Sequence, residues 1–289
     1  MSAARVPLWA AALVLTAGFL WSLQGVTIRV LDPATTSPQI VYWRNLGQYL
    51  TLLLIVAVMH RGHLLRAFGR AGPLALLGGA FQCLSSITVI FAFAYTTVAN
   101  VNFILSTAPF MAALIAWLIL GEVITRRAIM TMAAAAIGVG VMMIEGLSAG
   151  HLIGNGLVIV TALTFSGLAV ILRRNKHVDM LPTVCWGSCF GTLAGLAMTG
   201  GAIAIPLQDI ALCMAMGSLQ IGLGQALFIL ASRHVPAGPL ALLTLSEIVL
   251  GPIWAWVGVN EVPSQLTLAG GAIVISALVW QALGAAKRP

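Results

Sequence analysis

The sequence alternates between long apolar runs and short polar breaks. Ten runs have roughly 18 to 23 residues, which is the length that an α-helix needs to cross a bilayer. The predicted spans are residues 7–28, 39–59, 73–95, 99–120, 128–144, 152–172, 182–201, 210–231, 238–259 and 266–283. Because the breaks are short, the pattern predicts no soluble domain and no linker beyond the break near 145–151.

The composition indicates whether these runs are surrounded by water or by lipid. Hydrophobic residues make up 60% of the chain and charged residues 7%, whereas soluble domains carry about 25% charged residues. Such a chain cannot cover a water-facing surface, so an integral membrane protein is predicted. The formal net charge of +7 does not indicate nucleic-acid binding, because the basic residues lie in the breaks without interleaved aromatic residues. The first run is about twice as long as a signal-peptide core, which predicts a retained span.

The distribution of basic residues predicts the orientation. If ten spans cross the membrane, twelve of the 14 Lys and Arg residues fall on the side shared by both termini. These twelve are Arg5, Arg61, Arg66, Arg70, Arg126, Arg127, Arg173, Arg174, Lys176, Arg233, Lys287 and Arg288. The opposite side has Arg29, and Arg44 lies inside the second run. Because basic loops remain in the cytoplasm, we expect a bacterial inner-membrane protein with both termini cytoplasmic.

An internal repeat divides the chain into two halves. Residues Ala116, Trp117 and Glu122 recur 139 positions later, in the same order. Further pairs at offsets of 144 or 138 are Ser22–Ser166, Arg29–Arg173, Pro38–Pro182, Gly47–Gly191 and Gln82–Gln220. We therefore predict an all-α fold of ten transmembrane helices, built as five-helix repeats over residues 1–147 and 148–289. An odd number of helices per repeat inverts the second half, as in many secondary transporters.

Several motifs also carry a family resemblance. They are Trp21-Ser22, Arg29, Ser37-Pro38, Arg44, Ser106-Thr107-Ala108-Pro109 and Ala116-Trp117…Gly121-Glu122. This set resembles the drug/metabolite transporter superfamily, EamA group, over essentially the whole chain. The second half matches more loosely, with Phe165, Ser188 and Asn260 replacing motif residues. The resemblance implies a ten-helix exporter with cytoplasmic termini, and the chain looks most like bacterial amino-acid exporters, with the aromatic amino-acid exporters as the candidate subgroup.

Charged residues within the spans are the first candidates for function. Glu247 lies near the middle of its run, where insertion of a charge costs about 2.5–3.5 kcal/mol. It is either a ligand for a substrate ammonium and a proton-coupling group, or a neutral structural residue. Arg44 either contacts a substrate carboxylate and contributes to coupling or gating, or extends to the interface. Glu122 and Glu261 are expected at helix ends on opposite membrane faces, as anchors or gate elements.

Uncharged polar and aromatic residues within the spans form a second candidate group. Together with Glu247, the predicted substrate-binding residues are Trp21, Gln24, Gln82, Asn102, Phe165, Gln220 and Gln225. The amides either line a cavity between the halves or join helices by hydrogen bonds. Trp21 and its repeat mate Phe165 either stack on an apolar substrate or pack in the core.

Proline and glycine mark where helices bend or approach closely. Pro109 and Pro252 each interrupt backbone hydrogen bonding within a run, so they are candidate hinges for gating. Gly138 and Gly270 allow close approach of the fifth and tenth helices. That contact would serve a scaffold within a monomer or the surface of a weak homodimer.

These features together predict a secondary exporter rather than an enzyme. The five histidines lie in or beside the breaks, and the sequence has no HExxH motif, phosphate-binding loop or ATP-binding domain. No cofactor, metal or ATPase subunit is expected. The predicted partners are the lipid bilayer, a small-molecule substrate and coupling protons. We expect export of small amphiphilic metabolites, with neutral or aromatic amino acids first. A quaternary-cation drug exporter and a passive facilitator or channel remain open alternatives.

Overall fold

The computed structural model describes residues 7–121, 124–175, 179–232, 234–235 and 237–286. All regular elements among these residues are helices. Each of the ten predicted runs is helical, and 73–95 is predicted to the residue. Nine helical stretches within the described part are long and apolar enough to cross a membrane, and Leu243–Val259 is apolar but shorter. The structure therefore agrees with a multi-pass membrane protein.

The helices of the first half follow the predicted runs with two additional breaks. They are α1 (Leu8–Ser22), α2 (Gln24–Arg29), α3 (Ser37–Met59), α4 (Leu64–Ala71), α5 (Pro73–Tyr95), α6 (Val98–Leu105), α7 (Ala108–Leu120) and α8 (Arg126–Ala149). The first run bends at Leu23, which separates α1 from α2. The fourth run is interrupted between α6 and α7, immediately before Pro109.

The second half contains a π-helix as well as α-helices. Its elements are α9 (Leu152–Arg174), α10 (Leu181–Met198), α11 (Leu207–Ala215), η1 (Met216–Leu223), α12 (Gly224–Ser232), α13 (Ala237–Val259) and α14 (Gln265–Ala286). The helix α13 continues through Pro252. The break expected near 145–151 is present but shorter than predicted, because α8 continues to Ala149. The chain turns only at Gly150, whose φ of 75° is readily adopted by glycine.

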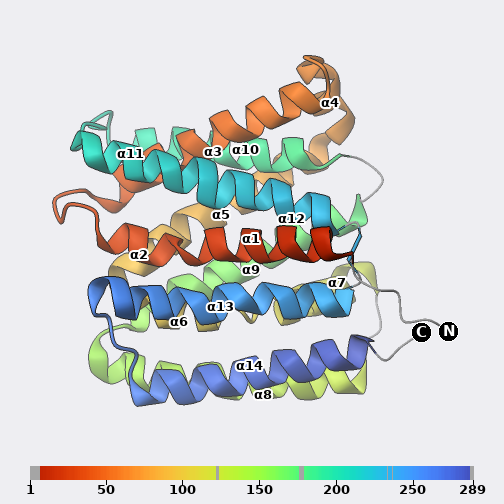
Figure 1. Cartoon of the computed structure of the whole chain (residues 1–289), viewed down its shortest axis with the longest axis vertical. Coiled ribbons are helices and arrows are strands. Elements are labelled where there is room, and N and C mark those ends of the chain that lie inside the picture. Colours follow the sequence, from red (N-terminus) through yellow and green to blue (C-terminus); the bar gives the residue numbers. More distant parts are fainter. Residues whose placement is uncertain (1–6, 122–123, 176–178, 233, 236, 287–289) are drawn as a thin grey trace.

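The short helix α4 was not predicted, because it is too brief to register as a span. Its two buried residues, Ala67 and Ala71, share one face, whereas Leu65 is 92% exposed. Phe68 extends the buried face with an edge contact to Trp186 of α10, at a centroid distance of 5.5 Å. We call the end of the bundle that carries α4 the α4 end, and the opposite end the α2 end (Figure 1).

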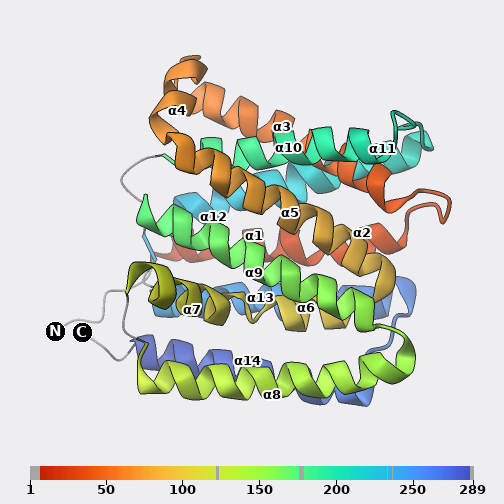
Figure 2. The same cartoon turned by 180° about the vertical axis from the view of Figure 1, so that it is seen from behind.

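The helices lie side by side along one direction and form a row of packed layers (Figures 1 and 2). At one edge of the row α3 packs against α10 and α5, and at the other edge α8 packs against α14. Between them, α1 contacts α12 and α13, while α9 contacts α5 and α7. The first residues of α1 and the last of α14 lie at the same end of the bundle (Figure 1).

Glycines allow the closest helix contacts. A methyl group added to Gly217 of η1 would overlap the carbonyl oxygen of Arg44, so α3 and η1 pack backbone against backbone. A methyl group on Gly138 of α8 would lie 2.7 Å from the carbonyl oxygen of Gly270 of α14. The first contact holds α3 against η1 at the level of the polar residues described next.

Candidate functional site

Arg44 is the centre of a buried polar network between α2, α3 and α5. Its side chain donates to Ser86 Oγ at 2.7 Å and to Gln24 Oε1 at 3.0 Å. Ser86 Oγ in turn donates to Asn45 Oδ1 at 2.9 Å, and Asn45 Nδ2 donates to the carbonyl of Val41 at 2.7 Å. The network joins three helices through neutral oxygens that are already oriented toward the guanidinium group.

The charge of Arg44 has no counter-ion among the described residues. Arg44 is 4% exposed, and its buried Nε atom has no hydrogen-bond acceptor there. The interpretation that Arg44 extends to the membrane interface is therefore wrong, because the hydrogen bonds to Gln24 and Ser86 hold its side chain inside the bundle. A buried cation without a carboxylate is costly. Such an arrangement is suited to an anionic ligand that completes the pairing.

Glutamine side chains extend the polar region toward η1 and α12. Gln48 Nε2 donates to Gln225 Oε1 at 2.9 Å, and Gln220 Nε2 donates to Thr27 Oγ1 at 2.9 Å. The Oε1 atoms of Gln48, Gln82 and Gln220 are buried and have no donor among the described residues. Unused acceptors of this kind are rare in proteins and can accept hydrogen bonds from a ligand or water.

The local structure explains how these amides are positioned. Gln48 lies one helical turn after Arg44 on α3, so both side chains face the same direction. Gln220 belongs to the π-helix η1, a conformation that occurs often at functional sites. Gln82 packs directly on Gly187 of α10, where a larger residue would collide with it. Gln82 and Gln220 are repeat mates in the sequence but contact different helices, α10 and α2, and a cavity lined by both amides stays a prediction.

Glu247 lies outside the hydrogen-bond network of Arg44. It belongs to α13 at the contact with α1, where its backbone nitrogen would lie 3.6 Å from a methyl group on Gly18. The residue is partly buried, and none of the described residues forms a hydrogen bond or ion pair with its carboxyl group. The two charged candidates therefore occupy different environments.

The aromatic candidates also differ. The Trp21 ring lies 5.4 Å from that of Phe228, and its indole nitrogen faces Gly224 of α12. Phe165 on α9 is 41% exposed, although Ala162 and Leu168, three residues to either side, are buried. Trp21 thus packs against a neighbouring helix, while Phe165 has a free face. Stacking of either ring on a substrate stays a prediction.

Asn102 and Pro252 lie at the contact of α6 with α13, whereas Pro109 lies at the beginning of α7. Asn102 Nδ2 donates to the carbonyl of Val98 at 2.9 Å, and its amide lies against Gly251, the residue before Pro252. Pro109 is in the first turn of α7, where its missing N–H removes no helical hydrogen bond. The break in the fourth run lies before Pro109 rather than at it, and the hinge role stays a prediction for both prolines.

Several polar residues of the site were not predicted. Asn45, Gln48 and Ser86 belong to the Arg44 region, and Trp254 Nε1 donates to Ser22 Oγ at 2.9 Å. The spacing of polar residues within the second run could have identified two of them, since Arg44, Asn45 and Gln48 fall within five consecutive positions. Ser86 had no such signal, because its role depends on how α5 packs against α3.

An ion pair at the α2 end joins α2 to the connection that follows α13 and to the region where α5 meets α6. Arg29 Nε donates to Glu261 Oε2 at 2.7 Å, and the same guanidinium donates to the carbonyls of Phe93 and Thr96, both at 2.7 Å. Glu261 Oε1 accepts from the Val98 backbone N–H at 2.5 Å. We call this set the latch. Glu122, the predicted counterpart of Glu261, lies outside the described residues.

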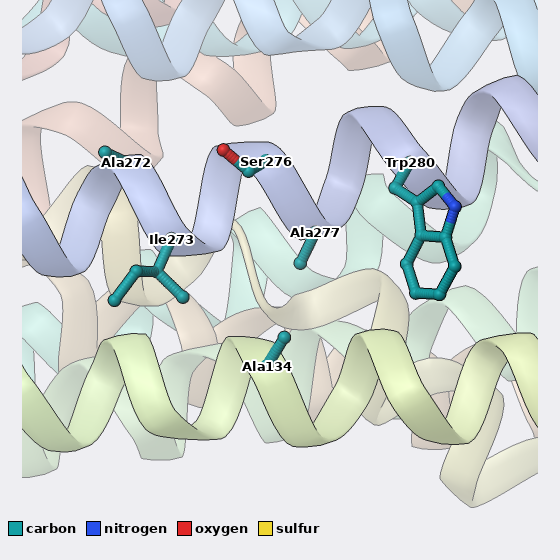
Figure 3. A pocket seen from close by; sticks show the side chains of 6 residues that line it. All are labelled: Ala134, Ala272, Ile273, Ser276, Ala277 and Trp280. Atoms are coloured by element: carbon teal, nitrogen blue, oxygen red, sulfur yellow. The ribbon is translucent and has the colours of Figure 1, made fainter.

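Two apolar grooves lie away from these polar residues. One, of 420 Å³, lies between α8 and α14 and is lined by small residues, Ile273 and Trp280 (Figure 3). The other, of 400 Å³, lies between α5, α7 and α9, with Phe81 and Ile115 among its lining residues. Because Arg44 and the glutamines line neither groove, the polar network is the better candidate site.

Comparisons with known proteins agree with this architecture. The EamA-like transporter family matches residues 8–144. The pseudopaline exporter CntI of two Pseudomonas aeruginosa strains is 25% identical over 272 residues, which cover 92% of this chain and 93% of the exporter. A solved structure described as "Crystal structure of protein" has a TM-score of 0.64 and 17% identity, and the match covers 96% of this chain and 99% of that one. That likeness shows the fold alone. The resemblance to the EamA group predicted from the sequence is thus confirmed by the match of residues 8–144 to the EamA-like transporter family.

Proposed function

We propose that this protein is a secondary transporter that exports small amphiphilic metabolites bearing a carboxylate, with neutral and aromatic amino acids as the first candidates. The observation that carries this proposal is Arg44, a buried guanidinium with neutral partners and an unused Nε. Arginine pairs with a carboxylate through two parallel hydrogen bonds. A substrate carboxylate would therefore supply the counter-ion that the protein lacks around Arg44.

Other candidate residues supply complementary groups for the rest of an amino acid. The buried Oε1 atoms of Gln48, Gln82 and Gln220 would accept hydrogen bonds from a substrate ammonium. Trp21 and Phe165 would contact an apolar side chain. Glu247 would bind either the ammonium group or the coupling proton, since a partnerless carboxyl group in an apolar helix is easiest to bury in its neutral form.

Alternating access between two inverted five-helix repeats, residues 1–147 and 148–289, is the proposed mechanism. Corresponding helices make corresponding contacts, because α3 packs on α10, α8 packs on α14, and the α5–α9 contact has its counterpart in α1–α12. This pattern supports the duplication. The substrate would bind between the halves, as in other transporters with inverted repeats.

The distribution of basic residues supports one orientation of the proposed transporter in the membrane. Basic residues gather in the breaks at the α4 end, whereas Arg29 lies at the α2 end. We infer that the α4 end and both termini face the cytoplasm of a bacterial cell and that the α2 end faces outward across the inner membrane. The pseudopaline exporter named above supports export as the direction of transport. We propose a monomer or weak homodimer that needs no ATPase subunit.

One observation favours a second candidate function. Glu247 has no described cationic partner, so it could bind a quaternary ammonium drug in place of an amino acid. In that case the carboxylate of the substrate, and hence Arg44, would be dispensable.

The two candidates are separated by counterflow in proteoliposomes. We expect labelled L-phenylalanine to exchange, tetraphenylphosphonium to be excluded, and the Arg44→Gln variant to lose exchange. Exchange of tetraphenylphosphonium alone, with full activity of Arg44→Gln, would replace the amino-acid proposal with drug efflux. Accumulation driven by an imposed pH gradient would distinguish a coupled carrier from a passive facilitator, which equilibrates its substrate without accumulating it.

A further inference from the structure

The short helix α2 connects the Arg44 site to the latch. Within its six residues, Gln24 accepts from Arg44, Thr27 accepts from Gln220 of η1, and Arg29 pairs with Glu261, which lies just after α13. These three contacts lie within about one and a half turns of one helix. Because the contacts share one short helix, a movement that breaks the Gln24–Arg44 hydrogen bond would also move Thr27 and Arg29.

The backbone at Leu23 separates α2 mechanically from α1. Leu23 N–H donates to the carbonyl of Leu20 at 3.4 Å, a tighter three-residue turn than an α-helix makes. Thr27 N–H then donates to the carbonyl of Leu23 at 3.0 Å, which begins α2. A bend of this kind lets α2 change its angle while α1 remains packed against α12 and α13.

The helix α2 seats directly on the beginning of α6. A methyl group on Gly25 would overlap the side chain of Val98, which is 0% exposed. The Val98 backbone N–H also donates to Glu261. The helix α2 therefore covers part of Val98, and an increase in the exposure of Val98 would report movement of α2 away from α6.

We propose that Gln24 is a built-in substitute for the substrate carboxylate, and that its displacement from Arg44 releases α2 and opens the latch. This proposal rests on the proposed function, because it requires a carboxylate that binds Arg44. Gln24 is then a positioning residue that acts through Arg44 and Arg29, in addition to the binding role predicted from the sequence.

The chemistry of the contact supports this order of events. The Gln24 amide offers Arg44 one neutral oxygen, whereas a carboxylate offers two charged oxygens, and charge-assisted hydrogen bonds are about twice as strong as neutral ones. A substrate would therefore compete successfully with Gln24 for the guanidinium. The latch is only partly buried, with side-chain exposures of 27% for Arg29 and 19% for Glu261, so water can replace its partners once α2 moves.

The experiment uses Val98→Cys as a reporter in a full-length chain whose four native cysteines are replaced by alanine. A membrane-impermeant maleimide is applied to the outer face of intact cells, and the labelling rate is measured. Val262→Cys, at a residue 68% exposed near the same end, is the control for reagent access. Thermal stability of each purified variant shows whether it folds.

Two substitutions of Gln24 predict opposite results. Gln24→Ala removes the link to Arg44, so labelling of the reporter should rise by roughly tenfold without any substrate. Gln24→Glu places a carboxylate on Arg44 permanently and holds α2 in place, so labelling should fall below the wild-type rate. Glu261→Gln should raise labelling as Gln24→Ala does, because it weakens the latch itself.

Several outcomes would overturn the proposal. If both Gln24 variants change labelling in the same direction, or neither changes it, Gln24 is only a packing residue. If the Gln24 variants behave as expected but L-phenylalanine fails to raise wild-type labelling, the link stands and the proposed substrate class fails. If L-phenylalanine is transported while all Gln24 variants label like the wild type, the proposed function stands and the link through α2 is wrong.

Discussion

Arg44 and Glu247 are both charged residues in apolar helices, but their surroundings differ. Arg44 is fixed by Gln24 and Ser86 and lies where α3 and η1 pack backbone against backbone. Glu247 lies at the α1–α13 contact and makes no hydrogen bond to a described residue. A guanidinium cannot lose its charge inside a protein, whereas a carboxyl group becomes neutral by binding a proton. Burial therefore leaves a permanent charge at the arginine, whereas the glutamate can be buried in its neutral form.

The largest expected effect comes from removing the charge of Arg44. In Arg44→Gln the substrate carboxylate loses a buried charged partner, which costs about 2–5 kcal/mol in comparable interfaces. We expect at least a ~30-fold loss of apparent affinity in counterflow of L-phenylalanine. Arg44→Lys is the matched control, since it keeps the charge without the two-pronged geometry and should lose less. Equal activity of all three proteins would mean that Arg44 does not contact the substrate.

Replacing a glycine by alanine tests how tightly the helices pack beside Arg44 and beside Glu247. Gly217→Ala forces a methyl group into the Arg44 carbonyl, and overpacking of this kind typically costs about 1–3 kcal/mol. Gly18→Ala is the matched change beside Glu247, where the methyl group would meet the Ser246 hydroxyl at 2.5 Å. A side chain can rotate away, so Gly18→Ala should lower the melting temperature less.

Gly140→Ala controls for the effect of alanine itself, because nothing lies within 4 Å of a methyl group there. It should leave the melting temperature unchanged or slightly raised, since alanine favours the helix. A larger loss of stability in Gly18→Ala than in Gly217→Ala would mean that the helices are packed more tightly beside Glu247 than beside Arg44.

Neutralising Glu247 should affect coupling rather than folding. Glu247→Gln keeps the shape and removes both the charge and the exchangeable proton, so we expect counterflow to persist while accumulation driven by a pH gradient is lost. Because Glu247 has no described partner, the melting temperature should not fall. Glu247→Asp is the control, as it retains a proton-binding group. Gradient-driven accumulation by Glu247→Gln at the wild-type rate would contradict the coupling role.

The smallest effect is expected from the glutamine pair. Gln48→Leu removes the 2.9 Å hydrogen bond to Gln225, which contributes about 0.5–1.5 kcal/mol. Apparent affinity should fall by no more than roughly tenfold. Gln39→Leu is a control on the same helix, because Gln39 donates to the carbonyls of Ala202 and Ala204 rather than to the Arg44 network. Equal losses in both variants would indicate a general effect on α3.

The sequence by itself determined the membrane environment, the helical runs and the candidate residues. A bilayer requires long apolar helices whose backbone is satisfied internally, which is why 73–95 is predicted to the residue and every other run is located. The cost of polar groups in lipid likewise singled out Arg44, Gln24 and Glu247. These conclusions need only local composition and the length of each run.

The tertiary structure alone decided which residues meet. Gln48 pairs with Gln225 across 177 positions and Arg29 with Glu261 across 232, and no local pattern encodes such partners. Apolar helix faces resemble one another in lipid, so the choice among them depends on small residues such as Gly217 that permit a particular close contact. The packing also places Arg44 against Gln24 and Ser86, while Glu247 at the α1–α13 contact has no hydrogen bond to a described residue.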